Sequence, residues 1–454
     1  MPLETLNPAN EESVKVFDEM TDKAVDEIIS SCHKEFIEWR KLSYSHRKPY
    51  MLKAARILNE ETERYAKILT LEMGKTITQA RAEVKKCAWV CEYYAENTES
   101  ILKEELIETD AAESFVQFDP LGIVLAVMPW NFPFWQVFRF AAPALMAGNG
   151  ALLKHASNVP QSALAIEEIF HKAGFPENIF RTLMIGSSKV SRVIENPLVK
   201  ATTLTGSEFA GKKVAETCGA NLKKSVMELG GSDPFIVLEN ADIELASSTA
   251  VTARLLNNGQ SCIAAKRFIV VESIYDEFET LFLKKMRSIK IGDPMDEETD
   301  LGPMAREDLM LELHEQVRRS VEMGATVILG GKPLEGKGYY YPPTIITNLI
   351  PGMPAYEDEL FGPVASLIKV KNEDEAIRVA NDSVFGLGAS LWTSDINKAK
   401  LLATKIQAGS VFINGLVKSD PRLPFGGINI SGYGRELSHY GIKEFVNIKT
   451  VWIK

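Results

Sequence analysis

Short apolar segments alternate with amphipathic segments from Gly122 onward, and this alternation constrains the fold more than any other feature. Strand-like runs lie at residues 123–127, 151–153, 180–184 and 201–204, and helix-like segments lie at 135–146, 161–173 and from 207 onward. Buried strands that alternate with helices are typical of a parallel sheet with helices on both faces. The sequence therefore predicts an α/β fold with a doubly wound parallel sheet.

A second series of the same kind follows Glu228, with strand candidates at residues 235–238, 268–271 and 327–329. Before both series, residues 22–103 contain almost no glycine or proline. Their apolar side chains recur at three- and four-residue spacing, which predicts helices. The region near Glu228 is therefore the predicted crossing between two α/β units, and ligands commonly bind in the cleft at such a crossing.

Length, charge and cysteine usage restrict the class of protein. A chain of 454 residues exceeds what one ordinary core accommodates, so two or three domains are expected. The formal net charge is −10, and no basic cluster of the kind that binds nucleic acid occurs. The apolar region 121–153 is interrupted by prolines, which argues against a membrane span.

Five cysteines form no Cys-x-x-Cys pair, and six histidines show no His-x-x-x-His spacing. This pattern favours a reducing compartment without a structural metal. The N-terminal residues lack a basic segment followed by an apolar one, so no signal peptide is expected. These features predict a cytoplasmic protein.

Cys262 and Glu228 are the first candidates for catalysis. Cys262 ends the polar segment 257–262, and Glu228 lies 34 residues earlier in the glycine-rich turn 227–231. A free thiol is only about 3% ionised at neutral pH, so a nucleophilic cysteine needs a proton acceptor or a nearby dipole. Glu228 is a candidate acceptor. The alternative is structural, because a lone cysteine is often a small buried apolar residue and Glu-Leu-Gly-Gly is often an ordinary turn.

A third segment, residues 129–133, favours the catalytic interpretation. It places Asn131 between two prolines within an otherwise apolar stretch. A rigid side-chain amide is what a site requires to stabilise an oxyanion. The three segments together predict a thiol nucleophile, a base and an oxyanion donor.

The segment 206–213 nearly matches the phosphate-binding loop Gly-x-x-x-x-Gly-Lys-Ser/Thr. Lys213 stands where that loop has its magnesium-binding hydroxyl, so hydrolysis of a nucleoside triphosphate is the weaker hypothesis. A strand that leads into Gly206 and a helix start still forms an anion site through free backbone N–H groups. No Gly-x-Gly-x-x-Gly motif occurs, so the sequence alone predicts no standard dinucleotide-binding turn.

Seven segments in order resemble the aldehyde dehydrogenase superfamily, and the resemblance covers residues 21–454. The segments are 129–133, 204–207, 227–231, 257–262, 359–363, 424–427 and 431–436. The resemblance implies two doubly wound parallel-sheet domains and a β oligomerisation arm. The implied divisions are an NAD(P)-binding domain of residues 1–106 and 125–228, a catalytic domain of residues 229–443, and an arm of residues 107–124 and 444–454.

The strand-like segment 113–118 resembles the family's oligomerisation hairpin, which pairs with a C-terminal strand near residues 449–453. This pairing implies a homodimer or a dimer of dimers, that is, a homotetramer. No membrane or nucleic-acid partner is expected, and a small aldehyde is the expected ligand.

The resemblance also implies a covalent mechanism. The Cys262 thiolate attacks the aldehyde, and the Asn131 amide and the Cys262 backbone N–H hold the oxyanion. Hydride transfer to the nicotinamide leaves a thioester, and Glu228 activates the water that hydrolyses it. The implied cofactor-binding residues are Pro129, Trp130, Lys154, Ser157, Gly206, Ser207, Gly230, Glu359 and Phe361.

Some of these positions match defined contacts in the family. Lys154 matches the lysine that binds the adenosine ribose, and Glu359 matches the acid that binds the nicotinamide ribose. The turn 205–207 matches the family turn that contacts the pyrophosphate. In NAD-selective relatives a glutamate three residues after the lysine repels a 2′-phosphate. Ser157 stands at that position here, so we expect use of both NADP and NAD with a preference for NADP.

Within the superfamily the chain resembles bacterial and archaeal succinate semialdehyde dehydrogenases. Arg139 lies eight residues after Asn131, where many relatives that oxidise uncharged aldehydes have tryptophan. Its guanidinium is a candidate partner for a distal carboxylate, and a structural ion pair is the alternative. Leu256 stands where some succinate semialdehyde enzymes have a second arginine, and the Ser419 hydroxyl is a candidate replacement. Phe425 completes the expected substrate site.

Other functions remain open at this point. The chain also fits a dehydrogenase for another small aldehyde, or a CoA-acylating enzyme in which a thiol resolves the thioester. Glu228 argues against CoA acylation, because a base that activates water is not needed there. A non-enzymatic member of the fold is disfavoured because Asn131, Glu228 and Cys262 are all present.

Overall fold

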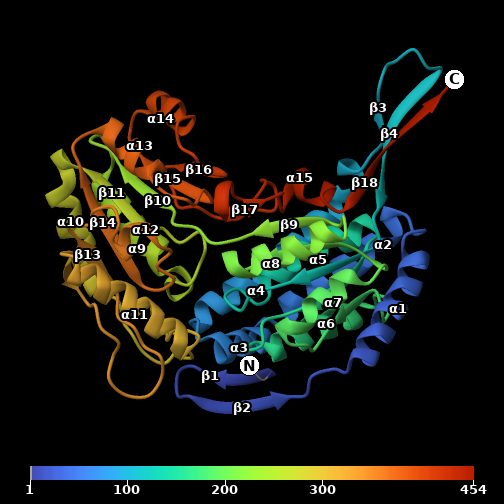
Figure 1. Ribbon diagram of the computed structural model, residues 1–454, viewed down its shortest axis with the longest axis horizontal. Coiled ribbons are helices and arrows are strands. Elements are labelled where there is room, and N and C mark those ends of the chain that lie inside the picture. The colour runs from blue at the N-terminus through green and yellow to red at the C-terminus, as the bar shows by residue number, and fades with distance from the viewer. Residues whose placement is uncertain (1–2) are drawn as a thin grey trace.

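A six-stranded sheet forms the centre of the first α/β unit in this computed structural model, which describes residues 3–454 (Figure 1). The strand order is β17 (Gly432–Tyr433), β9 (Lys224–Glu228), β8 (Val199–Thr205), β5 (Ile123–Val127), β6 (Gly150–Lys154) and β7 (Phe180–Thr182). Neighbouring strands are parallel except β17, which pairs with β9 in the antiparallel direction. The expected parallel sheet is confirmed, with one antiparallel strand added at its edge.

Helices cover both faces of this sheet, as the alternating sequence predicts. They are α1 (Asp22–Trp39), α2 (Tyr44–Glu60), α3 (Thr62–Met73), α4 (Ile77–Ile101), α5 (Trp135–Ala147), α6 (Pro160–Ala173), α7 (Val190–Glu195), which follows the short 3₁₀ turn η1 (Ser187–Lys189), and α8 (Glu208–Ala220). Helices α2 to α6 share one core with the sheet, and α1, α7 and α8 share another. The helices expected within residues 22–103 are α1 to α4.

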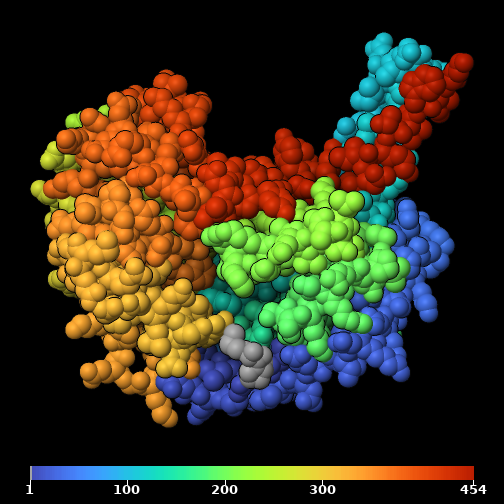
Figure 2. Space-filling view, viewed as in Figure 1, coloured from blue at the N-terminus to red at the C-terminus, as the bar shows by residue number. Residues whose placement is uncertain are grey.

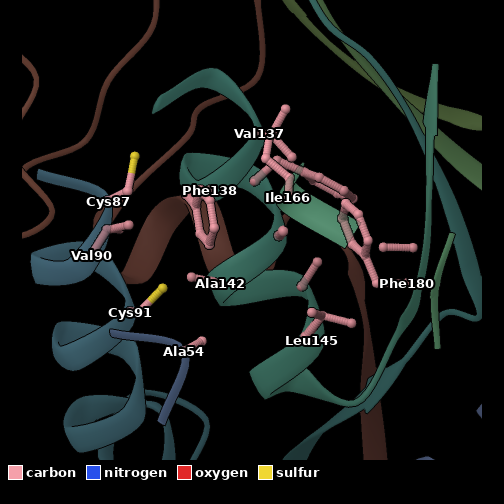
Figure 3. Close-up of a cluster of buried hydrophobic side chains, with 14 of the residues drawn as sticks. Ala54, Cys87, Val90, Cys91, Val137, Phe138, Ala142, Leu145, Ile166 and Phe180 are labelled. Atoms are coloured by element: carbon pink, nitrogen blue, oxygen red, sulfur yellow. The ribbon is translucent and has the colours of Figure 1, made fainter. Parts of the chain in front are cut away.

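Helix α5 lies in the middle of the larger core, and all of its residues are buried. Phe138 and Leu145 on α5 pack beside Cys91 on α4 and Ile166 on α6 (Figure 3). The helix ends at Gly148, whose φ of +100° is a left-handed conformation that glycine adopts without steric penalty. This packing fixes α4 and α5 against each other, and both helices contribute to the site described below.

A seven-stranded sheet forms the second α/β unit. The strand order is β12 (Thr326–Leu329), β13 (Thr344–Thr347), β14 (Val364–Val370), β11 (Arg267–Val271), β10 (Pro234–Val237), β15 (Gly388–Trp392) and β16 (Ser410–Ile413). All pairs are parallel except β12–β13. The expectation that residues 327–329 continue the parallel series is therefore wrong. No helix separates β12 from β13, and a parallel pair needs a crossover that is usually helical.

Two groups of helices cover the second sheet on its two faces. They are α9 (Ile243–Leu255) with the 3₁₀ turn η2 (Leu256–Gly259), α10 (Glu272–Arg287), α11 (Glu307–Glu322), α12 (Pro354–Glu357), α13 (Glu373–Asn381) and α14 (Ile396–Ala403). After β16 the chain returns to the first unit through η3 (Asn429–Ser431), β17 and α15 (Ser438–Lys443).

Two smaller sheets extend from these units. The C-terminal strand β18 (Val446–Ile453) pairs with β4 (Glu113–Pro120), which also pairs with β3 (Glu105–Leu106). Lys449 lies opposite Gln117, so the pairing predicted for these two segments is confirmed. The sheet projects from the body as an arm (Figures 1 and 2). At the other end of the chain, β1 (Leu3–Asn7) and β2 (Glu12–Phe17) form a hairpin that the sequence analysis did not predict.

The chain crosses between the two units at the end of β9. Glu228 is the last residue of β9, and β10 of the second sheet begins at Pro234. On the return, Gly432 of β17 pairs with Glu228. The predicted crossing near Glu228 is therefore observed, and a second connection lies beside it.

We expect Gly432→Ala to destabilise these two adjacent connections between the units. The φ of Gly432 is +114°, and a Cβ atom there would lie 1.9 Å from the Met227 carbonyl oxygen. The substitution forces β17 away from β9, so the free energy of unfolding in urea should fall by about 1–3 kcal/mol or more. Gly219→Ala is the matched control, because Gly219 is exposed in α8 and a Cβ there meets no atom within 4 Å. Equal stability of the two variants would contradict this account.

Candidate active site

A left-handed turn presents Cys262 at the junction of the two units. Asn257, Asn258 and Gly259 all have positive φ, at 58°, 57° and 77°. Asparagine and glycine tolerate this conformation better than other residues. The Asn258 amide fixes the turn by donating hydrogen bonds to the carbonyls of Gly74 and Pro303, both at 2.9 Å. The polar segment before Cys262 is therefore what makes the sharp turn possible.

Cys262 lies between two cavities. The larger one, of about 410 Å³, is lined by Pro129, Trp130, Asn131, Gly206, Ser207, Gly230, Glu359 and Phe361. The smaller one, of about 170 Å³, is lined by Phe132, Trp135, Arg139, Ser419 and Phe425. Cys262 lines both. The thiol is therefore positioned to contact molecules that enter from either side.

Burial raises the pKa of the Cys262 thiol to about 12, against the opposing effects of the Lys266 and Arg139 charges. Desolvation penalises the thiolate more than these two cations favour it. Cys262, the predicted nucleophile, therefore rests as a thiol and would require deprotonation before it attacks a carbonyl carbon.

The Asn131 backbone is held in place from two sides. Its carbonyl oxygen accepts hydrogen bonds from Lys75 Nζ at 3.0 Å and from Asn257 Nδ2 at 2.7 Å. Its own Nδ2 donates to the Gln260 carbonyl at 3.1 Å. Asn131 is therefore tied to the turn that carries Cys262, and its oxyanion role stays a prediction.

Lys75 and Glu83 form a fully buried ion pair that the sequence analysis did not identify. Glu83 also accepts hydrogen bonds from the backbone N–H groups of Phe134 and Trp135, each at 2.9 Å. A carboxylate at the start of α5 satisfies N–H groups that have no partner within the helix. The pair thus links α4, the beginning of α5 and the Asn131 carbonyl.

Glu228 is buried, and neither of its carboxylate oxygens has a hydrogen-bond partner within the described chain. Burial and then the neighbouring Glu436 carboxylate raise its pKa well above the ordinary range, while Arg139 acts in the opposite direction. Within residues 3–454 the structure shows no hydrogen bond from Glu228 to Cys262. The expectation that Glu228 takes the proton of the thiol therefore stays a prediction.

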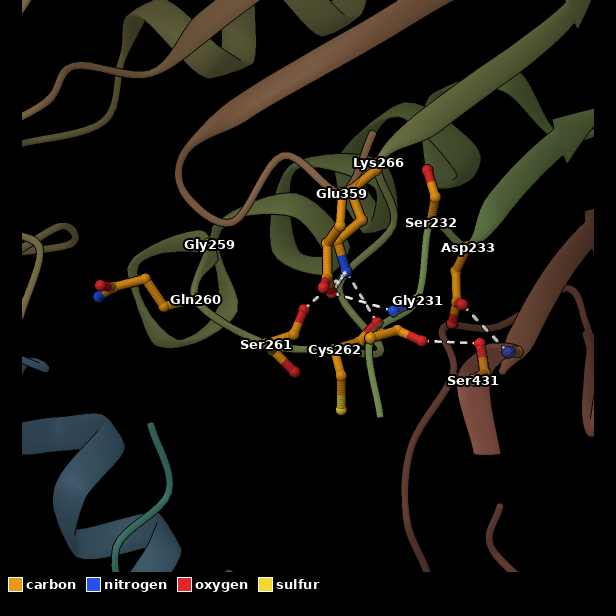
Figure 4. Close-up of polar contacts among 12 residues, drawn as sticks. Gly231, Ser232, Asp233, Gly259, Gln260, Ser261, Cys262, Lys266, Glu359 and Ser431 are labelled. Carbon is orange, nitrogen blue, oxygen red and sulfur yellow. Dashed lines mark hydrogen bonds and ion pairs between the residues drawn. The ribbon is translucent and has the colours of Figure 1, made fainter. Parts of the chain in front are cut away.

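Lys266 is a buried residue next to Cys262, and the sequence analysis did not identify it. Its Nζ donates to the carbonyls of Ser261 and Cys262 at 2.8 and 2.7 Å, and lies 3.2 Å from Glu359 Oε1 (Figure 4). The same Glu359 oxygen accepts a hydrogen bond from the Gly231 N–H at 3.0 Å. The position of Lys266 four residues after Cys262 was its only signal in the sequence. Spacing alone does not show where a lysine side chain points.

Most of the predicted cofactor-binding residues meet around the larger cavity, and their chemistry fits a dinucleotide. The turn at Gly206 and Ser207 leads into α8, whose first N–H groups face an anion favourably. Gly230 leaves room in the cavity wall, because a Cβ there would lie 2.5 Å from Glu359 Oε2. The rings of Trp130 and Phe361 pack edge to face with centroids 5.7 Å apart.

Lys154 and Ser157 lie at the C-terminal end of β6, outside the residues that line this cavity. Burial lowers the pKa of Lys154, against the opposing effect of Glu19. The Ser157 carbonyl accepts a hydrogen bond from the Glu4 N–H at 3.1 Å. The N-terminal hairpin therefore supports the loop that carries Ser157.

Arg139, Ser419 and Phe425 meet in the smaller cavity, as expected. The Arg139 guanidinium is also engaged inside the protein, because its Nε forms a buried ion pair with Glu436 and its Nη2 donates to Thr205 Oγ1 at 3.2 Å. Its Cζ atom lies 4.6 Å from the centre of the Phe425 ring. The structural ion pair, which was the alternative to substrate binding, is therefore present. Direct binding of a substrate by Arg139 stays a prediction.

The chain is similar over nearly its whole length to a known protein family. The profile of the aldehyde dehydrogenase family matches residues 1–451. The chain belongs to the aldehyde dehydrogenase family. It is 52% identical to the probable succinate-semialdehyde dehydrogenase [NADP(+)] of Synechocystis sp., and 50% identical to succinate-semialdehyde dehydrogenase [NADP(+)] 1 of Mycobacterium tuberculosis. Both alignments cover 100% of each chain.

Two solved structures share the fold over nearly the full length of the chain. The structure of Gox0499 matches with a TM-score of 0.99 and 40% identity over 100% of both chains. Succinic semialdehyde dehydrogenase from Streptococcus pyogenes, in complex with NADP+, matches with a TM-score of 0.97 and 40% identity over 99% of each chain. The two-unit α/β fold and the predicted family are thereby confirmed.

We expect Arg139→Met to lower the free energy of unfolding by about 3–5 kcal/mol, because it leaves the Glu436 carboxylate buried and unpaired. Urea denaturation followed by tryptophan fluorescence measures this change. The double variant Arg139→Met/Glu436→Gln removes both charges and should recover most of the loss. If the single variant is as stable as the wild-type protein, the ion pair does not hold Arg139 in the structure.

Proposed function

We propose that this protein oxidises succinate semialdehyde to succinate with NADP as the favoured cofactor. The observation that carries the proposal is the position of Cys262 between a cleft that fits a dinucleotide and a small cavity that contains cationic side chains. Relatives at 50 and 52% identity carry the name succinate-semialdehyde dehydrogenase [NADP(+)]. A semialdehyde with a distal carboxylate matches both the size and the charge of the small cavity.

The residues of this chain supply nucleophile, oxyanion donor and base. The Cys262 thiol loses its proton to solvent and its Sγ forms a bond to the aldehyde carbon, while Asn131 Nδ2 and the Cys262 N–H stabilise the oxyanion. The larger cavity, with Gly206, Ser207 and Glu359 in its wall, would hold the dinucleotide, which would supply the two-electron acceptor that turns the substrate into a thioester on Cys262. Glu228 then takes a proton from the water that adds to the thioester, and succinate leaves as the thiol is restored.

The raised pKa of Glu228 suits this role. A carboxyl with a raised pKa is a stronger base once it is ionised, but a smaller fraction of it is ionised at low pH. Turnover that is limited by thioester hydrolysis should therefore increase as pH rises through the raised pKa. Movement of Glu228 toward the thioester is required, since it lines neither cavity here.

We expect Glu228→Gln to separate the two halves of the reaction. A single-turnover burst of NADPH should persist, because acylation does not need the base that activates water, while steady-state turnover falls by roughly 100-fold or more. Stopped-flow absorbance at 340 nm measures both phases. Cys262→Ala is the control and should abolish burst and turnover together while dinucleotide binding remains. An equal fall of burst and turnover in Glu228→Gln would assign thiol activation to Glu228 as well.

Ser157 is the proposed determinant of the nucleotide preference. Serine leaves the ribose loop without the carboxylate that repels a 2′-phosphate, and Lys154 adds a favourable charge nearby. We expect both cofactors to be used and NADP to be preferred. Ser157→Glu should shift the ratio of kcat/KM values toward NAD, as measured with one aldehyde and both cofactors. An unchanged ratio would show that another residue sets the preference.

The arm supports a homodimer or a dimer of dimers. Its outer surface exposes large apolar side chains, with Leu106 at 76%, Ile448 at 59% and Trp452 at 50% of their full exposure. Exposed apolar clusters of this kind mark protein interfaces.

We further propose a cytoplasmic location, because the five cysteines are free. Among residues 3–454, no helix is long and apolar enough to span a membrane.

A further inference from the structure

One face of helix α4 forms a wall of the small cavity, and it carries a lysine that the mechanism does not use. Gln79, Ala82, Glu83 and Lys86 recur at helical spacing and all line the cavity with Cys262. Lys86 is partly buried, and its Nζ donates a hydrogen bond to Ser419 Oγ at 2.8 Å. The ammonium also lies 4.2 Å from the centre of the Trp135 ring. Lys86 is thus directed across the cavity.

The carboxylates near Lys86 are engaged by other cations. Glu83 pairs with Lys75, and Asp420 pairs with Arg422 at 2.7 Å. Within residues 3–454, Lys86 forms no ion pair. An ammonium that is partly removed from water and has no anionic partner favours binding of an anion.

The other cations of the cavity are less suited to this task. Arg139 already pairs with Glu436, so the two charges largely cancel. Lys418 also lines the cavity, but it is exposed and water screens its charge. Lys86 therefore provides the uncompensated positive charge of the cavity interior.

We propose that Lys86 and Ser419 bind the distal carboxylate of the substrate, and that Lys86 determines the preference for a semialdehyde acid over an uncharged aldehyde. The inference rests on the proposed function and names the residue that selects the substrate. The Lys86 ammonium and the Ser419 hydroxyl both donate to the carboxylate, while the rings of Phe132, Trp135 and Phe425 contact the carbon chain. In this arrangement the aldehyde end of the substrate faces Cys262.

Substitution of Lys86 tests this role with succinate semialdehyde and butanal, which have the same number of carbons. Lys86→Met should lower kcat/KM for succinate semialdehyde by roughly 10- to 150-fold, mainly through KM. The value for butanal should stay constant or rise. Lys86→Arg should retain much of the preference. The matched control is Lys85→Met, since Lys85 is the exposed neighbour on α4 and should behave as wild type.

The pH dependence of the wild-type enzyme gives a second readout that does not depend on a variant. Burial, and then the charge of Arg139, lower the pKa of Lys86 to about 8, while Cys87, Glu83 and Asp420 act in the opposite direction. Lys86 is therefore cationic below this pH and neutral above it. The ratio of kcat/KM for succinate semialdehyde to that for butanal should fall as pH rises through about 8. Lys86→Arg should remove this fall, because arginine stays charged.

The outcomes separate this inference from the proposed function. If the wild-type enzyme oxidises butanal with the same kcat/KM as succinate semialdehyde, the proposed function fails. If the wild-type enzyme prefers succinate semialdehyde but Lys86→Met keeps that preference, or loses both activities equally while folded, the role of Lys86 is overturned and the function stands. Should Lys86→Met fail to fold, the pH dependence of the wild-type ratio decides the question, and a ratio that is constant across pH 8 overturns the role.

Discussion

The main-chain carbonyl of Asn131 is the contact on which the site depends. It accepts hydrogen bonds from Lys75 and from Asn257, which belong to two separate parts of the chain. Lys75 is held in turn by Glu83, which also binds the N–H groups at the start of α5. One peptide group therefore connects the loop that carries the proposed oxyanion donor, the turn that carries Cys262 and the helices beneath them. Preorganised donors of this kind stabilise developing charge without reorganising during the reaction.

The interior around this contact contains many ionisable groups that are buried away from solvent. Burial raises the pKa of both Cys262 and Glu228, so each rests in its neutral form more readily than it would in water. The charges of Arg139 and Glu436 compensate each other, and the charge of Glu359 compensates that of Lys266. In such an environment each remaining charge acts over a longer range than it would in solvent. This environment favours the electrostatic selection of substrate that we propose for the small cavity.

The sequence was sufficient to predict the elements whose formation is local. Strand β5 spans residues 123–127 as expected, and α8 begins directly after Ser207, whose side chain accepts the Ala210 N–H. The pairing of β4 with β18 was also predicted, although the direction of β12 was not. Hydrophobic periodicity reports which residues are buried, but it does not report the neighbour against which an edge strand pairs. The motifs around Asn131, Glu228 and Cys262 indicated the reaction because each supplies a distinct chemical group.

The sequence by itself determined the α/β class and the family and predicted the nucleophile, because these depend on local patterns and on residue chemistry. Only the tertiary structure decided which charges meet. Arg139 has the offset expected of a substrate-binding residue, yet it pairs with Glu436, which lies 297 positions later in the sequence. Lys86 and Lys85 are adjacent lysines, and only Lys86 faces the cavity. The direction of a side chain and the partner of a charge are set by the packing of distant segments, which residue spacing does not encode.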